Sequence, residues 1–366
     1  MRGDGRGGTG WALAMLPFVL VAGIGIARGI VGPGQDVLPL LVAGPAVAAI
    51  VGGVVLTVAA GASAMAVAAV WDAFQGSGPD HRRAEVVLIA SAVITVTALA
   101  AARARERRDA ELREARGIAD AVQKVLLRPV PESACGVRLG VSYASASSGA
   151  RVGGDLYDVV AGPDRMRVIV GDVQGKGLPA LGTASAVLGV FREAAHDAGG
   201  GLEAVVGRIE STLARELGEE QFVTAVLAEF HRDVPGVRLL NCGHPPPLLL
   251  GPAGARYVGD RDGSLPLGMT DLGGAPRHEV ALPLGPGDGI LLYTDGASEA
   301  RGRSGDFFAL ASQCPLAAMP EPSRFVEAVR DKIISHVGRS LDDDMTLLLA
   351  YRGEAGPAVG RPPSAT

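Results

Sequence analysis

The chain has 366 residues, of which 48% are apolar and 20% charged, and its formal net charge is −5. This length allows one large domain or two ordinary ones, and the acidic balance argues against nucleic acid as a partner, which would favour a basic face. The three cysteines, Cys135, Cys242 and Cys314, are far apart and follow no metal-ligand spacing, which indicates reduced intracellular thiols.

The first hundred residues hold the long apolar runs and predict an all-α transmembrane region over residues 1–103. Residues 37–71 carry no charge over 35 positions. One helix of that length would be roughly 50 Å long, against a hydrocarbon core of about 30 Å, so we divide it near Gly52-Gly53. The expected helices are 11–30, 37–53, 54–71 and 84–102. A signal peptide is the competing interpretation of the first run, and the apolar runs behind it argue against that.

Basic residues predict how this region is oriented. They precede the first span and follow the last one, at Arg2, Arg6, Arg103, Arg105, Arg107 and Arg108. Both chain ends are then expected in the cytoplasm, in a multi-pass protein of the cell membrane. Arg82 and Arg83 fall on the opposite side in this scheme, which leaves three or four spans open. No span contains a mid-membrane acid or base, so a transporter has little support.

Residues 104–128 read as a charged linker helix that ends at Pro129. Leu112, Ala115, Ala119, Val122 and Leu126 follow a 3-4-3-4 spacing and form one stripe. Two interpretations remain open. The helix either packs on its own domain, or it forms a short parallel coiled coil that makes a homodimer and couples the membrane region to the domain behind it.

Residues 129–352 have the mixed pattern of a globular domain. Strands are expected at 137–147, 165–173, 221–230, 237–242, 246–251, 289–296 and 345–352, and helices at 178–198, 202–217 and 322–337. Strand clusters interrupted by a helix pair indicate an α+β sandwich whose sheets are covered by helices. The Gly- and Pro-rich tail, 353–366, is predicted to be disordered.

Acidic residues stand at the ends of four of these strands. Asp155 and Asp158 follow the first, Asp172 the second and Asp295 the third, and the run 342–344 precedes the last. If these ends gather at one edge, the carboxylates repel one another unless divalent cations neutralise them. With no His or Cys beside them, such oxygen ligands suit Mg²⁺ or Mn²⁺ rather than zinc. One Asp-Gly alone is most simply a turn, but four such sites favour a metal centre.

The motifs GGDLYD, GDVQGKG, NCGHPPPLL, LYTDGASEA and DDDMTLLL occur in this order. Together they resemble the SpoIIE-type branch of the PPM (2C-like) metal-dependent serine/threonine phosphatases, over about residues 118–351. The resemblance implies a four-layer α/β/β/α sandwich behind the transmembrane segment. Cys242 and Ala297 depart from the family's usual Ala and Val and leave the acids in place. GDVQGKG lacks the GxxxxGK[ST] spacing, so we reject an ATP-binding loop.

The resemblance also implies roles for individual residues around two ions of Mn²⁺ or Mg²⁺. Asp172 would bridge the two ions, with the carbonyl of Val173 as a further ligand. Asp295 and Asp343 would complete the second ion, and Asp155 would hold water at the first. Asp344 is a less certain neighbour, and Asp158 and Asp342 are expected to be structural. His244 is either a general acid or a histidine that fixes a turn, and we favour the turn.

The sequence therefore predicts a membrane-anchored, metal-dependent protein phosphatase. It would hydrolyse phosphoserine or phosphothreonine with water activated by two metals. The family implies a phosphorylated protein substrate, such as an anti-anti-sigma (STAS) regulator in bacterial signalling. The alternatives are a catalytically silent partner-binding module and a membrane sensor with the same fold. The substrate, the activating signal and the choice between Mn²⁺ and Mg²⁺ are not determined by the sequence.

Overall fold

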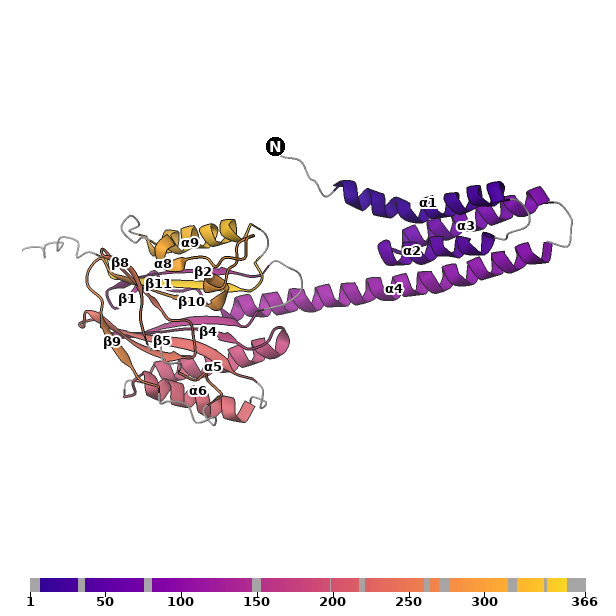
Figure 1. Cartoon of the computed structure of the whole chain (residues 1–366). Coiled ribbons are helices and arrows are strands. Elements are labelled where there is room, and N and C mark those ends of the chain that lie inside the picture. The colour runs from indigo at the N-terminus through magenta and orange to yellow at the C-terminus, as the bar shows by residue number, and fades with distance from the viewer. Residues whose placement is uncertain are drawn as a thin grey trace, which may run out of the picture. The chain divides into compact units, whose positions relative to one another are not determined.

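The computed structural model describes residues 7–31, 37–75, 81–146, 153–197, 199–216, 221–259, 264–269, 277–314, 321–338 and 341–353. The chain divides into two compact units, Met1–Glu114 and Ala115–Thr366, and helix α4 (His81–Leu126) contributes residues to both (Figure 1). The tail predicted to be disordered lies outside the described residues beyond Gly353, and so do Arg2 and Arg6.

The first unit is helical. It consists of α1 (Gly7–Val31), the 3₁₀ helix η1 (Leu38–Val42), α2 (Ala43–Val51), α3 (Val54–Gln75) and the first part of α4. The break between α2 and α3 falls at Gly52-Gly53, where the sequence analysis divides the long apolar run. The expected helices 84–102 and 104–128 are one continuous helix, since no Gly or Pro interrupts the sequence from residue 81 to residue 116.

Small residues let these helices pack closely. A Cβ on Gly44 would lie 2.4 Å from Val21 Cγ2, and a Cβ on Gly61 would lie 2.3 Å from Thr95 Cγ2.

Charged residues of α4 form hydrogen bonds with the turn between α2 and α3. Arg105 Nη1 donates to the Ile50 carbonyl at 2.7 Å, and Glu106 Oε1 accepts from the Val54 amide at 3.0 Å. The start of the charged part of α4 therefore lies at the same end of this unit as that turn.

Two helices of this unit are long and apolar enough to cross a bilayer, over Leu13–Ile30 and Val54–Trp71. The segment Pro39–Val51 is apolar but shorter. In α4, the side chains of residues 81–88 lie outside the described ones, so its apolar part is not assessed in the same way. Large apolar side chains such as Val19, Val55 and Phe74 are exposed, as lipid-facing residues would be.

The second unit contains two antiparallel sheets (Figure 1). The six-stranded sheet has the order β1-β2-β11-β10-β7-β8, with β1 (Ser133–Ala134), β2 (Val137–Ala144), β7 (Leu248–Gly251), β8 (Gly254–Tyr257), β10 (Gly289–Tyr293) and β11 (Met345–Tyr351). The five-stranded sheet has the order β3-β4-β5-β6-β9, with β3 (Asp155–Ala161), β4 (Arg165–Val173), β5 (Val223–His231), β6 (Gly236–Cys242) and β9 (Val280–Pro283).

Helices cover the outer face of each sheet. The pair α5 (Leu178–Ala195) and α6 (Leu202–Glu216) packs on the five-stranded sheet through a core that includes Phe191 and Ile209. On the six-stranded sheet lie α9 (Pro322–Val337) and the short helices α7 (Asp295–Ser298) and α8 (Leu310–Gln313). A third core fills the space between the sheets. The predicted four-layer α/β/β/α sandwich is therefore confirmed (Figure 1).

Four strands of this sandwich, β1, β3, β8 and β9, were not expected from the sequence, and β3 is the one that carries candidate site residues. Asp155 and Asp158 were expected to follow a strand, but they lie within β3, which the sequence analysis did not identify. The preceding glycines and the two aspartates give this segment the composition of a loop. Pairing along β4, with Asp155 opposite Asp172, makes it a strand, because cross-strand pairing outweighs local propensity.

Candidate active site

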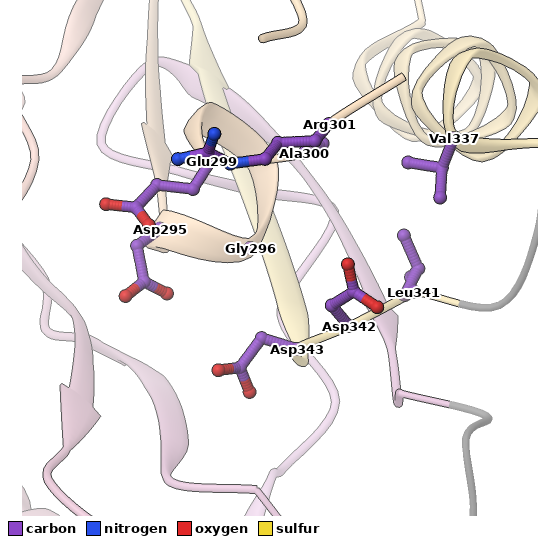
Figure 2. Close-up of a pocket in the computed structure, with 9 residues that line it drawn as sticks. All are labelled: Asp295, Gly296, Glu299, Ala300, Arg301, Val337, Leu341, Asp342 and Asp343. Carbon is purple, nitrogen blue, oxygen red and sulfur yellow. The ribbon is translucent and has the colours of Figure 1, made fainter. Parts of the chain in front are cut away.

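The acids gather at one end of the sandwich. Asp172 lies near the end of β4, Asp295 opens α7 directly after β10, and Asp343 precedes β11. All three line one cleft of about 520 Å³. A smaller cavity of about 200 Å³, shown in Figure 2, also contacts Asp295 and Asp343, whose carboxylates point to the same side while Asp342 turns away.

Asp155 is buried and does not line the cleft. Its Oδ2 accepts hydrogen bonds from Thr294 Oγ1 at 2.8 Å and Thr346 Oγ1 at 2.7 Å. These threonines follow β10 and lie on β11, so the carboxylate joins the two sheets. Burial, followed by the charge of Asp172, raises the pKa of Asp155 well above its usual value.

Asp172 has the most crowded carboxylate of the cleft. Burial, followed by the charges of Asp295, Asp343 and Asp344, raises its pKa to about 7. Burial also raises the pKa of Asp295, followed by the charge of Asp343. Carboxylates held this close in a partly buried cleft are stable as anions only when cations neutralise them. The site therefore has the electrostatic character of a cation-binding centre.

Glycines allow backbone oxygens to approach these acids. A Cβ on Gly154 would lie 2.3 Å from the Val173 carbonyl oxygen and 2.7 Å from Asp172 Oδ1. A Cβ on Gly296 would lie 1.9 Å from the Asp344 carbonyl oxygen. Neither contact could be accommodated without moving the backbone. The position of the Val173 carbonyl beside Asp172 thus depends on glycine at 154.

This donor set fits Mg²⁺ or Mn²⁺, because every donor is a carboxylate, a backbone carbonyl or water. Among the described residues, no three His, Cys, Asp or Glu side chains are grouped closely enough to hold one ion by themselves. An ion here would take few side-chain ligands and would complete its shell with the Val173 carbonyl and water. Mg²⁺ commonly binds in that way, since it keeps several of its waters.

The remaining aspartates are occupied by other contacts. Asp344 is buried, accepts from the Tyr143 hydroxyl and the Ala146 amide, and so joins β11 to the end of β2. Asp158 accepts from Arg192 of α5. Both contacts join secondary-structure elements, and neither carboxylate lines the cleft.

His244 lies at the cleft, and both of its ring nitrogens are engaged. Nε2 is 2.9 Å from the Tyr293 carbonyl oxygen, which can only accept, so Nε2 carries the proton. Nδ1 then accepts from Thr224 Oγ1 at 3.0 Å. Burial lowers the pKa of His244 to about 4, so the ring is neutral at physiological pH. It holds the β6–β7 turn against the end of β10 and has no free proton to donate.

The order of these motifs and the sandwich that joins them recur in a known family. The family model for stage II sporulation protein E (SpoIIE) matches residues 162–353. The chain belongs to the SpoIIE family. Asp172, Asp295 and Asp343 lie inside the matched range, whereas Asp155 lies before it. The second unit is accordingly a SpoIIE-type domain of the serine/threonine protein phosphatases.

One similar curated protein is IcfG from Synechocystis sp., which is 23% identical over 235 residues, covering 55% of this chain and 36% of IcfG. The RsbU and RsbW domains of Rv1364c from Mycobacterium tuberculosis are 28% identical, with a TM-score of 0.53 over 60% of this chain and 61% of that one. This SpoIIE-family chain therefore spans only part of the length of either relative.

Two further solved structures share the fold at lower identity. The PP2C domain of SiaA from Pseudomonas aeruginosa is 20% identical, with a TM-score of 0.55 over 69% of this chain and 99% of that one. SpoIIE from Bacillus subtilis, represented by its PP2C phosphatase domain and a regulatory fragment, is 17% identical, with a TM-score of 0.51 over 60% and 65%. The sandwich of this SpoIIE-family chain is thus the PP2C phosphatase fold.

The sequence analysis missed three residues that shape this site. Thr294 and Thr346 hold Asp155, and each stands within a quoted motif, in TDG and in MT. Lys176 lies at the cleft, where its Nζ is 2.7 Å from Asp343 Oδ1. Its signal is the GKG of GDVQGKG, a motif that the sequence analysis used for the family resemblance and tested as a phosphate loop without assigning a role to the lysine. The charge of Lys176 acts to lower the pKa of Asp172 against the larger effect of burial.

Proposed function

We propose that this chain is a membrane-anchored serine/threonine protein phosphatase that depends on two ions of Mn²⁺ or Mg²⁺. The observation that carries the proposal is the group of Asp172, Asp295 and Asp343 in one cleft, with the pKa of Asp172 raised by burial and by its acidic neighbours. Membership of the SpoIIE family supports it.

Each residue has a proposed role around the ions. Asp172 would bridge them, with the Val173 carbonyl as a further ligand, while Asp295 and Asp343 would hold the second ion and Asp155 would orient water. When bound, such ions supply a water nucleophile near neutral pH and stabilise charge on the phosphoryl oxygens. The chain itself positions these groups, since Thr294 and Thr346 fix Asp155 and glycine at 154 admits the Val173 carbonyl.

The proposed substrate is a phosphorylated protein, and a STAS-type anti-anti-sigma regulator is the favoured class. The similarity to Rv1364c, a chain with RsbU and RsbW domains, supports a role in the same kind of signalling. The cleft is open to solvent and holds about 520 Å³, which suits a phosphorylated side chain presented by another protein.

The helical unit is proposed to be a multi-pass anchor that leaves the phosphatase unit in the cytoplasm. Two of its helices meet the length and hydropathy of a span. Arg105 lies at the same end of the unit as the α2–α3 turn, in agreement with a cytoplasmic basic cluster at 103–108. Membrane lipid would then be the surroundings of its exposed apolar side chains.

The apolar stripe of the linker helix fits one of the two interpretations, packing on its own domain, near Leu126, and the other, pairing with a second chain, nearer its start. Leu126 packs against the phosphatase core and the neighbouring Gln123 is buried, donating to the Tyr143 hydroxyl at 2.8 Å. By contrast, Leu112 is 51% exposed and Val122 is 42% exposed. We propose that the end of α4 packs on its own domain, while the exposed part of the stripe pairs with the same helix of a second chain.

The test is phosphate release by the full chain in detergent, with Mn²⁺ and a serine-phosphorylated STAS protein from the same cell. Asp172→Asn should lower turnover at least about a hundredfold. Asp331→Asn, on the exposed face of α9, is the matched control and should leave turnover unchanged. A folded wild type that releases no more phosphate than Asp172→Asn from any phosphoprotein would support a silent binding module instead.

A further inference from the structure

A second pocket lies at the opposite end of the sandwich from the acids. It holds about 640 Å³ and is lined by the β1–β2 turn, the start of β2, the residue after β5, Pro286 and the end of β11. Arg352 lies eight positions after Asp344 along β11, which is roughly 26 Å at about 3.3 Å per residue in a strand. This pocket is therefore separate from the catalytic cleft.

Three arginines line it, Arg138, Arg232 and Arg352, and none of its lining residues is acidic. They come from three different strand ends. The Arg138 guanidinium stacks over the Tyr351 ring at 5.2 Å, and it also lies beside Gly353. Arg232 donates from Nε and Nη2 to the Pro163 carbonyl, at 2.9 and 2.7 Å.

These contacts leave the charges of the three arginines without an ionic partner among the described residues. Each contact is to a ring or to a neutral backbone carbonyl. Arg352 Nη2 donates to the Val234 carbonyl at 3.2 Å, but its Nε is buried and has no hydrogen-bond partner. A buried donor of this kind is costly, and like charges lining one pocket repel one another. A bound anion would relieve this repulsion.

The turn that forms one wall supports the same interpretation. Cys135 and Gly136, between β1 and β2, have φ values of 50° and 74°. A non-glycine residue in the left-handed region is uncommon, and such strain gathers at ligand sites. Asp164 is close enough to affect the pKa of Cys135, as Arg232 also is, yet it does not line the pocket.

We propose that this arginine pocket binds the phosphate group of a small phosphorylated molecule. Guanidinium groups match phosphate oxygens in geometry and bind them with two hydrogen bonds each. A volume of about 640 Å³ leaves room for an organic group beyond the phosphate and lies in the usual range of ligand pockets. The site is independent of the proposed phosphatase chemistry, since it shares no residue with the cleft.

The test is calorimetric titration of the full chain in detergent and EDTA, so that no divalent ion draws phosphate to the catalytic cleft. Pyrophosphate, ATP and adenosine are the probes. Saturable binding of pyrophosphate and ATP, but not adenosine, is expected. Binding of ATP would indicate that the pocket also has room for an organic group beyond the phosphates.

The variants Arg232→Gln and Arg352→Gln should each weaken binding about tenfold, because each removes charge-assisted hydrogen bonds. Arg324→Gln, on the exposed face of α9, is the matched control and should bind as wild type does. Hydrogen exchange of the wild-type chain provides a second measurement that needs no variant. Bound pyrophosphate should slow exchange at 133–138 and 352–353.

No binding, binding that both variants retain, or protection confined to other segments would each overturn the proposal.

Discussion

The two ends of the phosphatase sandwich carry opposite charge on the same strands. β2, β10 and β11 each run between the acid cleft and the arginine pocket, with Asp344 and Arg352 at the two ends of β11. The acids are held in place by hydrogen bonds from the fold, as Asp155 is by two threonines. The arginines contact neutral carbonyls and a ring. Each end thus concentrates side chains mostly of one charge.

Glycine serves a different purpose at each end. Near the acids it provides space, since a Cβ on Gly154 would strike the Val173 carbonyl oxygen. Near the arginines it provides backbone freedom, since a Cβ on Gly136 would meet nothing within 4 Å but its φ is 74°. The acid end is therefore the more sensitive of the two to added volume.

The largest expected effect on turnover comes from filling the space beside Gly154. Gly154→Ala puts a Cβ 2.3 Å from the Val173 carbonyl oxygen, so the backbone at the ion site must shift. We expect turnover with Mn²⁺ to fall about a hundredfold, the size of effect that a small misplacement of reacting groups produces. Gly189→Ala, in α5, meets nothing within 4 Å and should keep full turnover. Wild-type turnover in Gly154→Ala would show that the carbonyl has no role at this end.

A second prediction concerns the neutral histidine among the acids. His244→Ala leaves the Tyr293 carbonyl and the Thr224 hydroxyl without their partner, which should cost about 2 kcal/mol of unfolding free energy. The pH profile of turnover should keep its shape, because a ring with both nitrogens engaged donates no proton to the leaving group. Loss of the alkaline limb of that profile, with stability unchanged, would assign His244 to proton transfer.

A third prediction is a pH-dependent stability that only the acid end would give. The pKa of Asp172 is raised from 3.8 to about 7 in the folded chain. Between these values the folded state keeps a proton that the unfolded state has released, so stability without divalent ions falls as pH rises from about 4 to 7. In EDTA, the unfolding midpoint of wild type should fall over this pH range by about 5 °C more than that of Asp172→Asn. Parallel midpoints would mean that the acids are not crowded.

The sequence predicts most strands of this sandwich because they are long apolar runs. β4 and the helix at 322–337 have the expected bounds. The strands that it misses are β1, β3, β8 and β9. Three of these are only two to four residues long, and the aspartates of β3 resemble a loop until pairing with β4 fixes them. The acids and the threonines that hold Asp155 stand in recognisable motifs, but the sequence does not show that they touch, since Thr346 lies 191 residues from Asp155. The arginine pocket has no motif, because its residues come from three unrelated strand ends.

The smallest expected effect concerns Lys176, a cation within the acid end itself. Its ammonium is 2.7 Å from Asp343 Oδ1, and both side chains are partly exposed, so the pair contributes little to stability. It occupies an oxygen that the second ion is proposed to use. Lys176→Met should therefore raise the affinity for Mn²⁺ about threefold, measured by calorimetry, and leave the unfolding midpoint within about 1 °C. Weaker Mn²⁺ binding in this variant would mean that Lys176 helps to position Asp343 for the ion instead of competing with it.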